Sequence, residues 1–506
     1  MGEEKTLQIY FTSDVHGYIY PTDYRNPGER DIGLFKCANR FEKDGNTLVI
    51  DGGDLLQGSP LDAFQHDSVG SAEPLAEVMN ACGYDYVTLG NHDFNFGMEY
   101  LNSYLHTLQA RCLCQNLLDE DGTVRFPWRI HTLENGLRLG MVGIVTDHVN
   151  LWERPENLTG CRIVDPMEAA RQALREMEGK VDLTICIYHG GFERDLETNR
   201  VLSTSTENIA CKICEELDFD ILLTGHQHMS VHGQKYQNTF IVQPTDSGRE
   251  FIHVSAVVRD GEKSITGETI PAGGVCPSRL LERFRAMERG AQDWLDAVVG
   301  HMNAPLQPES PIEMAVKGSG LADFFNQVQM ATTNAQISVA SLANEVAGLP
   351  QVVRRRDVLT AYPYTNTLTV LEVSGKCLRQ ALERSAEYFD LDEAGKPIVS
   401  DRFLRPKVEH YNYDYYAGID YTFDLRRAVG QRVTQLTYEG REVQDGDSFT
   451  LCLNSYRASG AGGYPGYVDC PVRRSMSEEI SELILEFFRE NPSVEVQKKG
   501  TMTLLY

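Results

Sequence analysis

The run Gly90-Asn91-His92-Asp93-Phe94-Asn95 directly follows an apolar stretch, residues 86–89, and offers imidazole, carboxylate and amide groups. Four other apolar stretches also end in polar side chains: Asp14 with His16, Asp54, His189, and His226 with His228. Ligands bind at the carboxyl ends of strands in open α/β sheets. We therefore expect these side chains to meet at one edge of a sheet.

Seven of these side chains carry nitrogen or oxygen atoms that bind divalent metal ions: Asp14, His16, Asp54, Asn91, His189, His226 and His228. Side chains two residues apart in an extended segment share a face. Asp14 and His16 can therefore reach one cation together, and so can His226 and His228. One such motif alone is more often a turn with a hydrogen-bonded histidine, but five in one half of the chain favour a metal site. Seven donors exceed one tetrahedral zinc and suit two cations about 3.5–4 Å apart, bridged by a carboxylate. Mixed imidazole and carboxylate ligands suit Zn, Mn, Fe or Co, and the sequence leaves these four open.

The expected elements divide the chain into two domains, because 506 residues exceed what one hydrophobic core usually serves. The first half alternates strand-like and helical runs, which predicts an α/β fold, layered and partly antiparallel. A Gly- and Pro-rich stretch then precedes one amphipathic helix expected over residues 279–302. We place a metal-binding domain at residues 1–275, a linker and connecting helix at 276–311, and a smaller α+β domain at 312–506.

Composition excludes some partners. The formal net charge is -26, from 47 Lys+Arg and 73 Asp+Glu, and such a surface repels long nucleic acid. We see neither a signal peptide nor a run long enough to span a bilayer. The twelve cysteines are scattered, which favours a reducing compartment. We expect a cytoplasmic protein as the sequence is written, with an exported, periplasmic or cell-surface protein that has lost its signal as the alternative.

The five motifs, in this order, resemble those of the calcineurin-like metallophosphoesterases: Asp14-x-His16, Gly53-Asp54, Gly90-Asn91-His92, His189 and Gly225-His226-x-His228. The chain after Gly274 is similar to the C-terminal domain of the 5'-nucleotidase family, so the resemblance covers nearly the whole chain. It implies an N-terminal αββα sandwich, joined by a helix to a domain that binds the nucleoside. It also implies a phosphoric ester hydrolase in which two divalent cations activate a water for attack on phosphorus.

The resemblance assigns roles to the motif residues. It implies that Asp14, His16 and His228 bind one metal ion, that Asn91, His189 and His226 bind the other, and that Asp54 bridges them. His92 would be the catalytic imidazole that meets the phosphate and assists the departing oxygen. In 5'-nucleotidases an Asp three residues later pairs with this histidine, whereas this chain has Asn95. An amide cannot stabilise an imidazolium as a carboxylate can, so Asp93 or another acid would have to substitute. We therefore place Asp93 and Asn95 with His92 among the catalytic candidates.

A nucleoside also needs a flat surface for its base, and stacking on an aromatic ring contributes about 1–3 kcal/mol per base. Two loops rich in aromatic residues, 362–366 and 454–465, could supply it. A tyrosine alone more often packs in a core. The resemblance implies that Tyr364 and Tyr456 sandwich the base and that Asn366 lies beside it. Arg457 is a candidate phosphate ligand, with a structural role as the alternative.

Three departures from the 5'-nucleotidases point to one branch of the family. These are Asn95, Gly462 in place of an Asp, and residues 341–345 in place of an arginine-bearing stretch. They resemble the 2',3'-cyclic-nucleotide 2'-phosphodiesterase/3'-nucleotidase branch. We expect a monomer that hydrolyses mononucleotides or cyclic nucleotides. A 5'-nucleotidase or a UDP-sugar or dinucleotide hydrolase with the same site stays open, as does a non-catalytic nucleotide-binding protein.

Overall fold

The computed structural model describes residues 4–25, 28–202, 206–364, 366–405 and 408–506. The chain forms two compact units that divide between Asp293 and Trp294. Both units contain helices and sheets, which confirms the predicted layered α/β domain followed by a smaller α+β domain. The domain limits at residues 275 and 312 stay a prediction.

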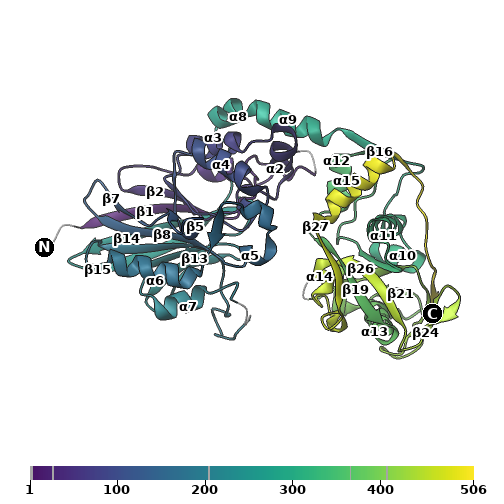
Figure 1. Ribbon diagram of the computed structural model, residues 1–506. Helices are drawn as coiled ribbons and strands as arrows, with labels where there is room; N and C mark the ends of the chain where they lie inside the picture. Colours follow the sequence, from purple (N-terminus) through teal and green to yellow (C-terminus); the bar gives the residue numbers. More distant parts are fainter. Residues whose placement is uncertain (1–3, 26–27, 203–205, 365, 406–407) are drawn as a thin grey trace. The chain divides into compact units, whose positions relative to one another are not determined.

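Two six-stranded sheets form the centre of the first unit (Figure 1), which also contains a small sheet of β6 (Val124–Phe126), β5 (Cys114–Asp119) and β9 (Cys161–Ile163). The first sheet has the order β15 (Glu262–Pro271), β14 (Glu250–Arg259), β1 (Lys5–Thr12), β2 (Thr47–Asp51), β3 (Tyr86–Val87) and β4 (Arg111–Cys112). The second has the order β12 (Val231–Tyr236), β13 (Thr239–Gln243), β11 (Ile221–Thr224), β10 (Leu183–His189), β8 (Arg138–Val145) and β7 (Arg129–Thr132). Each sheet contains a run of parallel strands. Antiparallel pairs stand at one edge of the first sheet and at both edges of the second, so the sheets are partly antiparallel, as predicted.

Alternate residues of the second sheet face two different cores, because side chains along a strand point to opposite faces. In β10, Ile185 and Ile187 belong to the core between the sheets. Cys186 and Tyr188 belong to a second core, which the sheet shares with its covering helices. Helices lie on the outer side of both sheets and complete the αββα sandwich (Figure 1): α3 (Glu73–Cys82) and α4 (Gly97–Thr107) on one, α6 (Pro166–Met177) and α7 (Ala210–Glu216) on the other.

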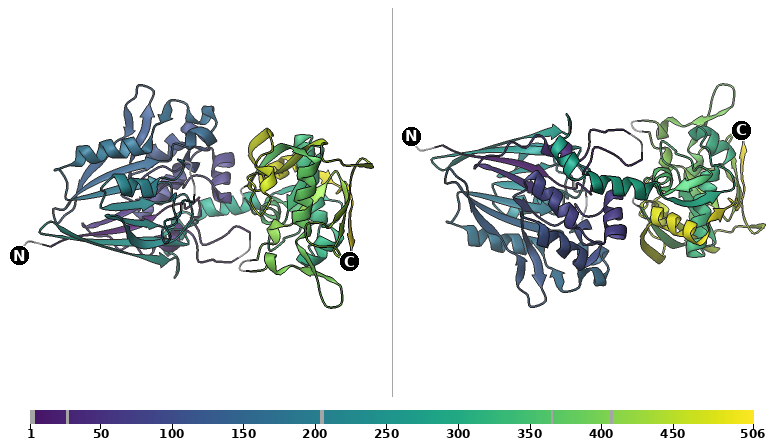
Figure 2. Two further views of the ribbon diagram at one scale, coloured as in Figure 1. Left: turned by 90° about the horizontal axis from the view of Figure 1, so that it is seen from below. Right: turned by 90° about the horizontal axis from the view of Figure 1, so that it is seen from above.

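A five-stranded sheet forms the centre of the second unit. Its order is β22 (Asp414–Ala417), β17 (Ile337–Ser341), β26 (Ser448–Asn454), β19 (Thr367–Ser374) and β27 (Val472–Glu479). Val370 belongs to a core with α11 (Gly320–Thr333) and α15 (Ile480–Glu490), which lie side by side (Figure 2). Leu371, the next residue, belongs to a core on the other face with α13 (Gly375–Ala386). Smaller sheets join β18 (Val352–Arg354), β16 (Val298–Met302) and β28 (Ser493–Val494), and β25 (Arg441–Glu442), β24 (Val433–Tyr438), β23 (Asp420–Asp424) and β29 (Met502–Leu505).

The single helix expected over residues 279–302 is wrong. The structure has α8 (Ser278–Arg283) and α9 (Arg285–Leu295), followed by strand β16. Two adjacent valines favour a strand here, and Gly300 lets it approach α15, since a Cβ at this position would lie 2.4 Å from the Phe488 ring.

None of the helices in the described part of the chain has the length and apolar character needed to cross a bilayer.

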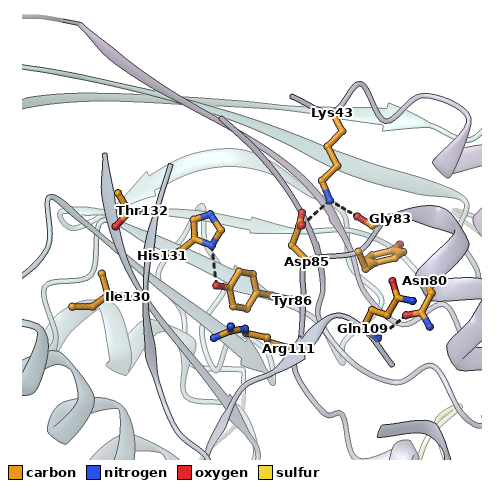
Figure 3. Close-up of a pocket in the computed structure, with 11 residues that line it drawn as sticks. Lys43, Asn80, Gly83, Asp85, Tyr86, Gln109, Arg111, Ile130, His131 and Thr132 are labelled. Atoms are coloured by element: carbon orange, nitrogen blue, oxygen red, sulfur yellow. Dashed lines mark hydrogen bonds and ion pairs between the residues drawn. The ribbon is translucent and has the colours of Figure 1, made fainter. Parts of the chain in front are cut away.

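A pocket of about 520 Å³ lies at the amino ends of β3 and β4 (Figure 3). Lys43 Nζ donates hydrogen bonds to Asp85 Oδ1 at 2.6 Å and to the Gly83 carbonyl at 2.8 Å. The hydroxyl of Tyr86 and Nδ1 of His131 lie 2.9 Å apart. The predicted metal ligands follow the carboxyl ends of the strands, so this pocket is separate from the candidate site.

The packing between the two sheets can be tested at Leu223, which is fully buried in β11. Leu223→Ala leaves a cavity and should lower the free energy of unfolding of the first unit by about 2–5 kcal/mol. Ile130, on edge strand β7, is 43% exposed, so Ile130→Ala should change it by about 0.5 kcal/mol or less. Hydrogen exchange of the β10 and β11 amides measures the free energy of unfolding in both variants. Equal losses of stability in Leu223→Ala and Ile130→Ala would contradict a core between the two sheets.

Candidate active site

Loops after strands of both sheets bring six predicted ligands into two groups of three. Asp14, His16 and His228 form one, and Asp54, His189 and His226 form the other; within each, the donor atoms lie within 4.8 Å of one another. The main-chain N–H of His226 donates to both carboxylate oxygens of Asp14, at 2.9 and 3.0 Å. This bond joins the loop after β11 to the loop after β1, so the two sheets contribute to one site.

Five of these six residues hold an unusual backbone conformation: Asp14, His16, Asp54, His226 and His228 have φ between 49° and 73°. They are five of the twelve non-glycine residues with positive φ in the described chain. This left-handed conformation costs a non-glycine residue about 1–3 kcal/mol, and such strain concentrates at functional sites. The strain therefore supports the assignment of these loops as a functional centre.

Asp14 and Asp54 are fully buried carboxylates. Within the described chain their ion-pair partners are histidines: His189 Nε2 lies 3.1 Å from Asp54 Oδ2, and His228 Nε2 lies 3.5 Å from Asp14 Oδ1. Burial opposes ionisation of Asp14, but the His228 contact and the charge of His189 hold its pKa below the ordinary value. Burial also opposes ionisation of Asp54, and the charges of His189 and His92 bring its pKa well below the ordinary value. Both groups are therefore ionised, as metal ligands must be.

Ring nitrogens and one amide oxygen are positioned to bind cations. Nδ1 of His16 donates to the Gln57 carbonyl and Nδ1 of His189 to the Gly52 carbonyl, both at 2.7 Å. Each ring therefore directs Nε2 toward the carboxylates, the usual arrangement of a metal-binding histidine, and a bound cation would take the place of any proton on Nε2. The amide oxygen of Asn91 is buried, and within the described chain it has no hydrogen-bond partner. A buried acceptor without a donor fits a bound cation, and with the two groups of carboxylates and imidazoles the residues present suit two divalent ions.

His92 lies next to these ligands and is half-buried. Its ring centroid lies 5.3 Å from that of His16. Nδ1 of His92 donates to Asn95 Oδ1 at 2.7 Å. Asn95 Nδ2 in turn donates to Glu153 Oε1 at 2.9 Å. The Asn95 amide therefore holds the His92 imidazole, and the Glu153 carboxylate holds the Asn95 amide.

The prediction that Asp93 acts on His92 is corrected by the structure. The buried Asp93 carboxylate accepts four main-chain N–H groups, at 2.8–3.0 Å, from Asp54, Leu55, Leu56 and Gly90. These bonds use both of its oxygens and tie the loop after β2 to the loop after β3. Asp93 is therefore a positioning residue for the ligand loops.

The suggested role of Arg457 in substrate binding is also corrected. Arg457 is 1% exposed, and its guanidinium pairs with Asp414 at 2.9 Å. The remaining N–H groups donate to Asn412 and to the carbonyls of Tyr411 and Ala461. No donor is left for a phosphate, so Arg457 holds its own loop in place, which was the alternative reading of this residue.

The other nucleoside-site candidates lie in the second unit. Tyr456, in α14 (Ser455–Ala458), is 40% exposed, and its ring lies edge-on to that of Tyr411, with centroids 6.5 Å apart. Tyr364 is half-buried and lies edge-on to Tyr362 at 6.0 Å. The carbonyl of Asn366 accepts the Ile480 N–H at 3.0 Å. Tyr364 and Tyr456 thus keep ring surface that a base could reach, and their roles stay proposals.

Three residues near the centre were missed from the sequence. Glu207 Oε1 lies 3.0 Å from His226 Nε2, and the Trp152 ring stacks on His226 with centroids 5.6 Å apart. Glu153 is the third. Trp152 and Glu153 lie at the end of α5 (Val149–Trp152), shortly after β8. An Asp-His pair, Asp147 and His148, follows β8, and this signal could have indicated the segment as part of the site. The sequence around Glu207 has no comparable motif.

Comparisons with known proteins agree with this site. The family described as calcineurin-like phosphoesterase matches residues 7–230, and the 5'-nucleotidase C-terminal domain matches residues 298–469. The trifunctional nucleotide phosphoesterase protein YfkN of Bacillus subtilis is 25% identical to this chain. The alignment covers 96% of this chain and 38% of YfkN. The chain thus spans less than half of that relative. The 2',3'-cyclic-nucleotide 2'-phosphodiesterase/3'-nucleotidase of Yersinia enterocolitica is 23% identical, over 98% of this chain and 86% of its own.

A solved structure matches the whole chain. It is that of a candidate 5'-nucleotidase of Staphylococcus aureus in complex with α-ketoglutarate, with 31% identity and a TM-score of 0.77. The match covers 99% of this chain and 100% of that one. Calcineurin-like phosphoesterases use a dinuclear centre of divalent metal ions, which agrees with the two groups of ligands. The chain therefore belongs to the calcineurin-like phosphoesterases that carry a 5'-nucleotidase C-terminal domain, and it is a metal-dependent phosphoric ester hydrolase.

Proposed function

We propose that the chain is a nucleotide phosphohydrolase of the 2',3'-cyclic-nucleotide 2'-phosphodiesterase/3'-nucleotidase type. The observation that carries this proposal is His92, which lies beside two groups of metal ligands with its Nδ1 held by Asn95 rather than by an aspartate. The relative from Yersinia enterocolitica supports the same substrate class. A 5'-nucleotidase is the second candidate, favoured by the full-length match to the Staphylococcus aureus structure.

In this proposal Asp14, His16 and His228 would hold one cation, Asn91, His189 and His226 would hold the other, and Asp54 would be shared between them. His226 would use Nδ1, because its Nε2 faces Glu207. Two bound divalent cations would offset charge on the phosphoryl oxygens and make a water acidic enough to attack phosphorus. The chain's own contribution is a rigid set of loops that holds these ligands at fixed separations.

The proposed role of His92 is to donate a proton to the departing oxygen. Since Nδ1 is engaged by Asn95, Nε2 is the ring nitrogen that faces the substrate. The water gives one proton to solvent and its oxygen bonds to phosphorus, the phosphorus–oxygen bond to the ribose breaks, and the proton on Nε2 passes to the ribose oxygen. A cyclic phosphate would open first to a 3'-phosphate, and a second hydrolysis would release the nucleoside and phosphate.

We further propose that Tyr364 and Tyr456 bind the base and that Asn366 contacts it. We also propose a monomer, because one chain supplies every candidate residue. The twelve free cysteines support a cytoplasmic location, and export stays the alternative.

Substrate preference can be measured as phosphate release in the presence of Mn or Co. We expect 2',3'-cyclic AMP and 3'-AMP to be preferred over 5'-AMP and over a plain aryl phosphate. His92→Ala should lower kcat about 100-fold or more, because general acid catalysis is lost. A preference for 5'-AMP would favour the second candidate, activity on the aryl phosphate alone would contradict a nucleoside site, and bound metal without turnover would favour a binding protein.

Base stacking can be tested with Tyr364→Ala and Tyr456→Ala. Each should raise KM for 3'-AMP about 10-fold, since one stacking contact contributes about 1–3 kcal/mol, and should leave KM for p-nitrophenyl phosphate unchanged. Tyr506→Phe, at an exposed residue of the same unit, is the control. Equal changes for both substrates would show that the tyrosines do not recognise the base.

A further inference from the structure

A continuous chain of hydrogen bonds connects the proposed catalytic imidazole to Glu153. Nδ1 of His92 donates to Asn95 Oδ1 at 2.7 Å, and Nδ2 of Asn95 donates to Glu153 Oε1 at 2.9 Å. All three side chains are half-buried, which shields these bonds partly from competing water. The carboxylate in this chain of bonds is therefore separated from the imidazole nitrogen by one side chain, that of Asn95.

Asn157 holds Glu153 in this position. Its Nδ2 donates to Glu153 Oε2 at 2.9 Å and to the Asn95 carbonyl at 2.8 Å. Both carboxylate oxygens of Glu153 are therefore engaged, one by each asparagine. The segment that carries Glu153 also carries Trp152, which stacks on His226, so this segment contacts both His92's partner and a proposed metal ligand.

The carboxylate decides which way the Asn95 amide points. An ionised carboxylate only accepts hydrogen bonds, so the amide must turn its NH2 group toward Glu153 and its oxygen toward His92. The amide oxygen also only accepts, so the proton of the neutral imidazole must lie on Nδ1. Nε2 is then the nitrogen that exchanges a proton with the substrate.

We propose that Glu153 is a positioning residue that, through Asn95, orients the His92 ring and fixes its tautomer. The inference rests on the proposed function of His92 and deepens it. When Nε2 gives its proton to the leaving ribose oxygen, the imidazolium becomes neutral and Nδ1 keeps its proton on Asn95. Glu153 takes up no proton, and its carboxylate keeps the Asn95 oxygen turned toward Nδ1 of His92.

The first test compares two leaving groups. Glu153→Gln removes the charge and lets the amide of Asn95 turn either way, so kcat for 3'-AMP should fall about 10-fold to 100-fold. Nitrophenolate needs little help from an acid, so kcat for p-nitrophenyl phosphate should fall by about 3-fold or less. Glu153→Asp keeps a carboxylate and should recover part of the loss. Glu156→Gln, an exposed residue of the same segment, is the matched control and should match the wild type.

A second test does not depend on turnover. In the zinc-loaded protein, nitrogen and carbon chemical shifts of the His92 ring, assigned with His92→Ala, should show protonation at Nδ1 only. Glu153→Ala should add the Nε2-protonated form, while the zinc content stays at the wild-type value. An unchanged tautomer in Glu153→Ala would overturn the proposal.

A third test moves the negative charge one residue closer to the imidazole. Asn95→Asp alone would place two carboxylates against each other, and Glu153→Gln alone removes the charge. The double variant Asn95→Asp with Glu153→Gln restores one carboxylate with a donor behind it, and its kcat for 3'-AMP should exceed that of either single variant. A double variant no better than the weaker single one would contradict the positioning of His92 through this chain of hydrogen bonds.

The outcomes separate this inference from the proposed function. A wild-type protein that hydrolyses nucleotides, with Glu153→Gln equally active on both leaving groups, would overturn the role of Glu153 alone. A wild-type protein without phosphatase activity would overturn the proposed function, and the tautomer measurement would still decide whether Glu153 controls His92. Equal losses of kcat for both leaving groups would indicate a merely structural role.

Discussion

Two buried carboxylates, Asp14 and Asp54, determine much of the first unit. A buried negative charge is costly unless positive charge compensates it, and in the described chain these two groups form ion pairs with histidines alone. A protonated imidazole supplies positive charge but cannot bind metal, and a neutral imidazole binds metal but supplies no charge. Divalent cations held by neutral imidazoles supply that charge, which is why the donor atoms converge on one centre.

The fold brings these groups together in a simple way. Parallel strands in each sheet end at the same edge, and sharp left-handed turns follow them directly. Asp93 joins two of the turns through four main-chain N–H groups, and the Asp14 contact with the His226 N–H joins the two sheets. The strain of the turns is thus offset by hydrogen bonds that include the ligands themselves.

The sequence predicted what local spacing determines. Strand ends and residues two apart indicated the six side chains that the fold brings into two groups able to hold metal ions, and periodicity indicated the layered fold. It misassigned Asp93 and Arg457, because the partners of a charged side chain depend on which loops fold against it. It missed Glu153 for the same reason, since this residue lies 58 positions from Asn95 in the chain. The prediction of one helix over residues 279–302 was wrong because β16 pairs with β18 and β28, and this pairing determines its structure more than the amphipathic pattern does.

The central claim is that the two groups of residues hold two cations. The direct measurement is anomalous diffraction from crystals of the protein grown with Mn. The account predicts two anomalous peaks about 3.5–4 Å apart, one beside Asp14, His16 and His228 and the other beside His189 and His226, with Asp54 between them. A single peak, or peaks away from these residues, would contradict it.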